Sequence, residues 1–84
     1  MADVVMYSTG YCAYCARARE LLYKKNVEFT DIRVDLQPEL RDEMITKSGR
    51  RSVPQIFING QAIGGCDDLY ALEDQGKLNQ LLKG

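Results

Sequence analysis

The chain has 84 residues, of which 45% are hydrophobic and 27% are charged, a balance typical of a small globular protein rather than a disordered one. Its formal net charge of −1 argues against nucleic acid or a membrane surface as a partner. No apolar run approaches the roughly 18 residues that a spanning helix needs, and the N-terminus lacks a signal-peptide pattern. We therefore expect one domain over residues 1–84, located in the cytoplasm.

The cysteines are the most informative residues. There are three of them, and the chain has no histidine. A secreted disulfide scaffold of this size usually carries more cysteines, in an even number. Here Cys12 and Cys15 form one close pair and Cys66 stands alone. This usage fits a reducing compartment, in which a disulfide within the pair would be transient and catalytic.

Hydrophobic periodicity divides the chain into strands and helices. The apolar run before the cysteine pair has β-branched and aromatic members, which favours a buried strand. Asn59-Gly60 is a strong hairpin signal, because a type I′ turn needs positive φ at both central positions. In chain order we expect a strand over residues 4–7, a helix from 12 to 24, a strand over 27–35, a helix from 38 to 48, strands over 55–58 and 61–63, a helix over 67–73 and a last short helix over 78–82.

The order of these elements is β-α-β-α-β-β-α, followed by the last short helix. Two strands joined by a helix are expected to be parallel, with a right-handed crossover, and the hairpin adds an antiparallel edge. The sequence therefore predicts an α/β fold with a four-stranded mixed sheet flanked by helices around one modest core. This is the thioredoxin-like layout.

The cysteine pair falls where the first strand gives way to a helix. Cys12 is expected at the N-cap of that helix, where unpaired N–H groups and the helix dipole favour a thiolate. Cys15 lies one turn further on, on the apolar stripe, so Cys12 would attack and Cys15 would resolve. The alternatives are a small core residue with a chance neighbour, or half of a zinc site. Zinc is disfavoured, because a structural site needs four ligands and only Cys66 remains.

Three motifs, in order and in register, resemble a known family. They are Tyr11-Cys12-Ala13-Tyr14-Cys15, Ser52-Val53-Pro54-Gln55-Ile56-Phe57-Ile58 and Gly64-Gly65-Cys66-Asp67-Asp68. Together they look like a glutaredoxin of the small bacterial dithiol type, and the resemblance covers essentially the whole chain. It implies the thioredoxin fold and the glutathione-dependent reduction of protein disulfides and of protein–glutathione mixed disulfides. Cys12 would be the nucleophile and Cys15 the resolving thiol, with glutathione as co-substrate and no metal.

The resemblance also implies a glutathione-binding set. Val53-Pro54 resembles the family's cis-proline turn, which would turn the backbone of Val53 toward an extended peptide. Gly65, Cys66 and Asp67 resemble the segment that holds the γ-glutamyl end, where N–H groups suit a carboxylate and Asp67 suits an ammonium group. Without the resemblance, a trans proline and a simple aspartate N-cap, at Asp67 or Asp68, would be the commoner structures.

Two further residues are assigned through the resemblance. Tyr14 would form a wall of the groove, and Arg41 could reach the glycine carboxylate, although a solvated helix arginine is the commoner case. The thiol of Cys66 has no assigned catalytic role.

Two departures from the family lie near the cysteines. Ala13 stands where proline is usual, which restores an N–H that could stabilise the Cys12 thiolate. Thr9 stands where many members have a lysine, so one cation is expected to be missing.

Three functions remain open from the sequence. The first is a dithiol glutaredoxin acting as a monomer on disulfide-containing and glutathionylated proteins. The second is a carrier of an iron–sulfur cluster ligated with glutathione, which is typical of single-cysteine members and does not match Ala13-Tyr14-Cys15. The third is an electron donor reduced by thioredoxin reductase, which the Gly65-Cys66-Asp67 segment argues against.

Overall fold

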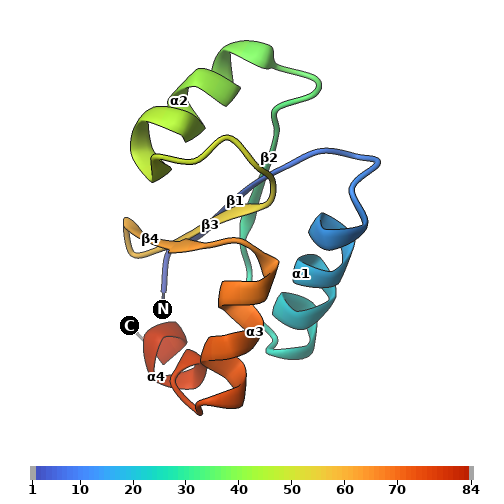
Figure 1. The fold of residues 1–84 in the computed structure, drawn as a ribbon. Coiled ribbons are helices and arrows are strands. Elements are labelled where there is room, and N and C mark those ends of the chain that lie inside the picture. The colour runs from blue at the N-terminus through green and yellow to red at the C-terminus, as the bar shows by residue number, and fades with distance from the viewer. Residues whose placement is uncertain (1, 84) are drawn as a thin grey trace.

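The computed structural model describes residues 2–83. Within them the chain forms four strands and four helices, in the order predicted from the sequence (Figure 1). The elements are β1 (Val4–Ser8), α1 (Ala13–Lys24), β2 (Thr30–Arg33), α2 (Pro38–Ser48), β3 (Gln55–Ile58), β4 (Gln61–Gly64), α3 (Cys66–Asp74) and α4 (Leu78–Lys83). None of the helices in this part of the chain is long and apolar enough to cross a membrane.

The strands form one mixed sheet in the order β2-β1-β3-β4. β1 is parallel to β2 and antiparallel to β3, and β3 is antiparallel to β4. The predicted hairpin is confirmed, since Asn59 and Gly60 have φ values of 52° and 81°. This is the expected thioredoxin-like arrangement.

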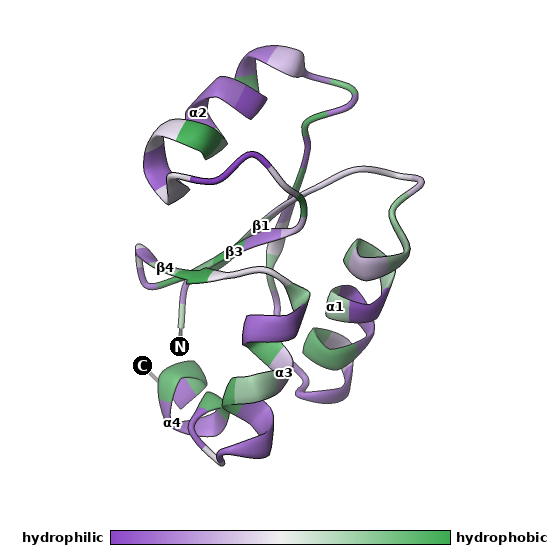
Figure 2. Cartoon of the chain, viewed as in Figure 1, coloured by the Kyte–Doolittle hydropathy of each residue, from purple (hydrophilic) through white to green (hydrophobic). Residues whose placement is uncertain are grey.

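Helices cover both faces of the sheet: α2 lies on one side, and α1 and α3 lie on the other (Figure 1). Because side chains alternate along a strand, each face has its own apolar cluster. Val4 and Met6 of β1 pack with α1, α3 and α4, whereas Tyr7 packs with Met44 of α2 and with Phe57. The expectation of one core was therefore wrong, because the sheet separates two clusters. Figure 2 shows that most of α2 is hydrophilic.

The predicted strand over residues 27–35 was too long. The paired segment is Thr30–Arg33 only. Asn26 adopts a φ of 56°, and the Val27 N–H bonds back to the Leu22 carbonyl, so the chain is still leaving α1 where the strand was expected to begin. Val27 and Phe29 instead pack at the margin of the larger cluster. Their apolar character reflects that packing and not strand pairing.

The topology brings three loops together at one end of the strands. The end of β1 lies beside the start of β3, since Tyr7 pairs with Gln55, and the end of β4 lies beside the same strand, since Gly64 pairs with Ile56. The loop before α1, the loop before β3 and the turn into α3 therefore meet there. These are the segments that carry the three motifs.

Candidate active site

Cys12 is the N-cap residue of α1. Its backbone is extended, with φ −96° and ψ 118°, and its Sγ accepts the Cys15 N–H at 3.3 Å. A side chain that bonds the N–H three residues on is the usual N-cap arrangement, with sulfur here in place of oxygen. The first turn of α1 carries no carboxylate, so no side chain in that turn competes with the thiol for the positive end of the helix.

The surroundings of Cys12 favour its thiolate. Burial alone would raise the pKa of the thiol, but hydrogen bonds from the Cys15 thiol and from the N–H groups of Cys15 and Tyr14 outweigh burial, and Arg19 adds a positive charge. The net effect lowers the pKa of Cys12. Because the thiolate is the reactive form of cysteine, Cys12 is set up as a nucleophile.

Cys15 lies in a different environment only one turn away. It is fully buried, while Cys12 is partly exposed, and both are free thiols. Burial raises the pKa of Cys15 to about 11, and the neighbouring Cys12 adds to the increase. Cys15 is thus a protonated, protected thiol that donates to its partner. The two cysteines have the unequal exposure and acidity that an attacker and a resolver require.

A groove of about 250 Å³ opens beside the cysteines. Every residue that the sequence predicts for glutathione binding lines it, and the sequence analysis did not assign three of its other residues. The predicted residues are Tyr14, Val53, Pro54, Gly65, Cys66 and Asp67, and the additional ones are Arg50, Ser52 and Asp68. The structure therefore brings the Val53-Pro54 motif and the Gly65-Cys66-Asp67 motif together in one groove next to the start of α1.

The Val53-Pro54 peptide bond is cis, as the resemblance implied. The Val53 carbonyl lies 3.8 Å from the Cys12 Sγ, within reach of a hydrogen bond from the protonated thiol. Val53 therefore borders the reactive sulfur directly, and its backbone is the part of this loop nearest to Cys12.

The opposite wall is the start of α3. Gly65 is the N-cap, and Asp68 Oδ2 accepts the Gly65 N–H at 3.0 Å. Of the two aspartates considered as a cap, Asp68 therefore makes the capping contact, while Asp67 also lines the groove. Gly64 precedes them with a φ of 118°, and a Cβ at that position would collide with Asp68 Oδ2. The glycine is thus required both by its conformation and by the close approach of the carboxylate.

Cys66 lies at this wall but is buried. Burial raises the pKa of its thiol, and the charges of Asp67 and Cys12 raise it further, against the opposing effect of Arg17. The surroundings of Cys66 therefore disfavour its thiolate, in contrast to those of Cys12.

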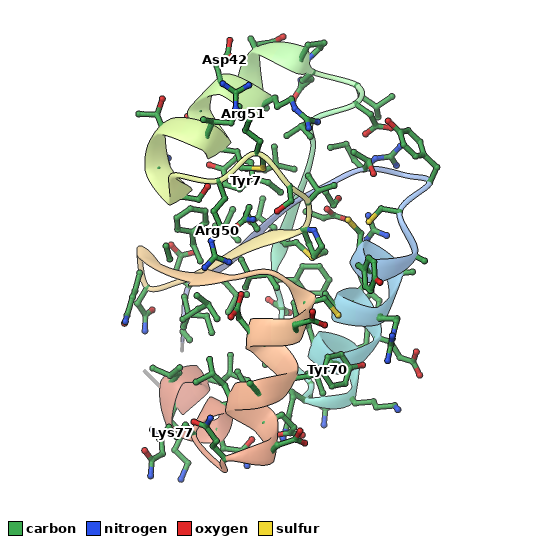
Figure 3. The ribbon with its side chains drawn as sticks, viewed as in Figure 1. Tyr7, Asp42, Arg50, Arg51, Tyr70 and Lys77 are labelled. Carbon is green, nitrogen blue, oxygen red and sulfur yellow. The ribbon has the colours of Figure 1, made fainter. Side chains whose placement is uncertain are left out.

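The arginine of the groove is Arg50, not Arg41. Arg41 does not line the groove; it donates to the Arg51 carbonyl at 3.0 Å. Arg50 Nη1 lies 3.0 Å from Asp68 Oδ2, so its guanidinium joins the two walls. Figure 3 shows Arg50 and Arg51 on the loop that follows α2. The only sequence signal for Arg50 was its position a few residues before the Val-Pro motif.

The structure bears on the two departures from the family, Ala13 and Thr9. The N–H groups that stabilise the Cys12 sulfur belong to Tyr14 and Cys15, so the N–H that Ala13 restores is not among them. Thr9 is buried, and Arg19 donates to the Thr9 carbonyl at 3.4 Å, so a cation of α1 lies against this loop although position 9 has no lysine. The sequence analysis assigned no role to Arg19.

Within residues 2–83, no group of three or more His, Cys, Asp or Glu side chains is arranged to hold a metal ion.

Comparison with known proteins identifies the family. A sequence model of the family named Glutaredoxin matches residues 4–63. Glutaredoxin 3 of Escherichia coli (strain K12) is 53% identical over 83 residues, which cover 99% of this chain and 100% of the relative.

Solved structures agree. The solution structure of glutaredoxin from Brucella melitensis has a TM-score of 0.86 and 57% identity, covering 99% of this chain and 90% of that one. The crystal structure of a buckwheat glutaredoxin–glutathione complex has a TM-score of 0.91 and 30% identity, covering 98% and 77%. Together with the paired cysteines at the start of α1, these similarities show that the chain belongs to the glutaredoxin family of glutathione-dependent thiol oxidoreductases.

Proposed function

We propose that Cys12 is the nucleophile and Cys15 the resolving thiol of a dithiol glutaredoxin that reduces protein disulfides and protein–glutathione mixed disulfides. The observation that carries the proposal is the inequality of the pair. Cys12 is partly exposed with a lowered pKa, and Cys15 is buried with a pKa of about 11. We further propose that residues 1–84 act as one domain, as a monomer, in the cytoplasm.

Glutathione mixed disulfides would be reduced through Cys12 alone. The Cys12 thiolate attacks the glutathione sulfur, the protein thiol leaves with the electron pair of the broken bond and takes up a proton, and Cys12 becomes glutathionylated. A second glutathione then attacks that glutathione sulfur, releases Cys12 as a thiolate and leaves as glutathione disulfide. Hydrogen bonds from Tyr14 and Cys15 to the Cys12 sulfur make it a good leaving group in this second step.

Protein disulfides would use both cysteines. Cys12 attacks one substrate sulfur, the substrate S–S bond breaks, and the other substrate sulfur leaves as a thiolate that takes up a proton, so that Cys12 is held in a mixed disulfide. Cys15 then attacks Cys12, expels the second substrate thiol and forms the Cys12–Cys15 disulfide, which two molecules of glutathione reduce. The Cys15 N–H already bonds the Cys12 Sγ, so the two residues need little rearrangement for this step.

Glutathione is proposed to lie in the groove beside Cys12. The Val53 backbone would pair with its cysteine residue, backbone N–H groups at the start of α3 would hold its γ-glutamyl carboxylate, and the Asp67 carboxylate would bind its ammonium group. Tyr14 would form a side wall. The proposal is supported by the convergence of all these residues on one groove and by the glutathione complex of the buckwheat relative.

The test is the reduction of a glutathione mixed disulfide, coupled to glutathione and glutathione reductase. We expect Cys12→Ser to abolish turnover, whereas Cys15→Ser and the control Cys66→Ser keep it within roughly threefold of wild type. With an intramolecular protein disulfide as substrate, Cys15→Ser should lose activity as well. Full activity of Cys12→Ser in the first assay would refute the assignment.

A further inference from the structure

A polar network lies behind the cysteine pair, on the side away from the groove. Arg19 extends from α1 to the neighbouring strands β1 and β2, where its Nε lies 2.7 Å from Asp31 Oδ2 and its Nη2 lies 2.8 Å from Ser8 Oγ. The Ser8 hydroxyl in turn hydrogen-bonds Asp31 Oδ1. Ser8 is a completely buried residue of β1, so the sheet holds this end of the network in place.

The network adjoins Cys15 in two ways. Arg19 follows Cys15 by four residues, so the two side chains lie one above the other on the same face of α1. Arg19 also donates to the carbonyl of Thr9 at 3.4 Å, and the backbone of Thr9 is one of the groups that lower the pKa of Cys15 against the dominant effect of burial. Burial dominates the raised pKa of Cys15, and the charge of Arg19 is one of the effects that oppose it.

A second cation, Arg33 on β2, is close enough to interact with Cys15 when that thiol ionises, although Asp35 is its main partner. Its guanidinium is engaged elsewhere, with Nη2 2.6 Å from Asp35 Oδ2. The other cysteine of the pair is Cys12, and the negative charge of its thiolate opposes the ionisation of Cys15. Once Cys12 is bound in a mixed disulfide it no longer carries that charge, and the cation of Arg19 remains.

Stability alone is a weak explanation for such a network. The Arg19 and Asp31 side chains are 20% and 29% exposed, and taking two charges largely out of water offsets much of their attraction. Apolar residues of similar size would hold α1 to the sheet about as well. The position next to a buried thiol that must ionise points to a role in the reaction.

We propose that Arg19, held by Asp31 and Ser8, is a positioning residue for the resolving step and places a fixed positive charge behind Cys15. This inference rests on the proposed two-cysteine function. In that step the Cys15 thiol loses its proton, its sulfur attacks Cys12 of the mixed disulfide, and the expelled thiolate takes up a proton. Two electrons pass from the cysteine pair to the substrate disulfide. The positive charge stabilises the anion that forms on Cys15.

The inference separates two substrate classes. Protein disulfides require the attack by Cys15, whereas glutathione mixed disulfides are completed by a second glutathione. Arg19 should therefore matter most where Cys15 acts, and it should favour protein disulfides over glutathionylated proteins.

The experiment follows the reaction of reduced protein with glutathione disulfide by rapid mixing, acid quench and mass spectrometry. The first phase is glutathionylation of Cys12, and the second is its loss as the Cys12–Cys15 disulfide forms. Wild type, Arg19→Gln and Arg19→Lys are compared across pH. The matched control is Lys24→Gln, which removes the same charge from α1 at an exposed position where Lys24 pairs with Glu20.

We expect Arg19→Gln to slow the second phase about threefold to fivefold, because part of the lost thiolate is offset by the greater nucleophilicity of a more basic sulfur. Its pH profile should move to higher pH, the first phase should change less, and Arg19→Lys should restore most of the rate. Lys24→Gln should match wild type. Equal slowing of both phases, no slowing, or failure of Arg19→Lys to restore the rate would overturn the inference. Absence of the first phase in wild type would overturn the proposed function itself.

Discussion

Helices α1 and α3 begin on opposite sides of the same groove, and each has a cysteine in its opening residues. Cys12 is the N-cap of α1, and Cys66 is the first residue of α3. Both thiols thus lie at the positive end of a helix, yet the pKa of Cys12 is lowered and that of Cys66 is raised. A helix start alone does not activate a cysteine.

The difference has two causes. Cys12 is partly exposed and its sulfur receives hydrogen bonds, whereas burial dominates at Cys66 and no hydrogen bond opposes it. The first turn of α3 also contains Asp67 and Asp68, while that of α1 contains no acid. One side of the groove therefore favours an anion on the protein, and the other presents carboxylates that suit a cationic group on a ligand.

The largest expected effect is on thiol reactivity. At pH 7, iodoacetamide should alkylate Cys12 at least about a hundredfold faster than Cys66, because only Cys12 is both accessible and substantially ionised. The rate at Cys12 should titrate below the usual cysteine pKa of about 8.5, since a lowered pKa leaves more thiolate at neutral pH. Mass spectrometry of single-cysteine variants measures each rate. Similar rates at the two thiols would break the comparison.

On the α3 side, Asp67→Asn should raise the KM for glutathione about tenfold and change kcat by less than about twofold. The reason is the loss of a charge-assisted hydrogen bond to the ammonium group, a contact of roughly 1.5–3 kcal/mol. Asp74→Asn, at the far end of the same helix, removes an equal charge and is the control. Steady-state kinetics with varied glutathione decides, and an unchanged KM would contradict the assignment of Asp67.

Giving α1 an acidic first turn like that of α3 should weaken its thiolate. Ala13→Asp places a carboxylate beside Cys12, which raises the pKa of the thiol and slows its alkylation at pH 7 by about threefold to tenfold. Ala13→Asn, which has the same shape without the charge, should slow it much less. Equal rates for the two variants would mean that the absence of acids at the start of α1 is unimportant.

The smallest effect is expected for Ala13→Pro, which installs the residue usual in the family. Proline is accepted at the first position of a helix, and the N–H groups directed at Cys12 come from Tyr14 and Cys15. The alkylation rate at pH 7 should therefore change by less than about twofold. A larger change would show that the Ala13 N–H does reach the sulfur in solution.

Local signals explain what could be predicted from the sequence. The position of Cys12 at a helix start, the Asn59-Gly60 turn and the end of α2 at Gly49 each depend on a few adjacent residues with a strong conformational preference. The order of elements follows from them. The over-long second strand arose because Val27 and Phe29 have strand-like character but are buried by packing.

The parts of the site that were missed depend on contacts distant in sequence. Arg19 reads as a solvated helix residue until β1 and β2 are placed beside it, and its contacts with Ser8 and Asp31 span 11 and 12 residues. Arg50 meets Asp68 across 18 residues. The periodicity of a sequence does not reveal which distant residues contact each other, and an arginine side chain can be either exposed or partly buried. Only the folded arrangement of the loops shows that Arg50, and not Arg41, lines the groove.

The absent side chain at Gly64 has a consequence for protein engineering. Any larger residue would have to adopt a φ of 118° and would displace the Asp68 carboxylate from the Gly65 N–H. Grafting this groove onto another scaffold by copying only its lining residues would therefore fail at the entry to α3. The glycine outside the groove has to be transplanted with it.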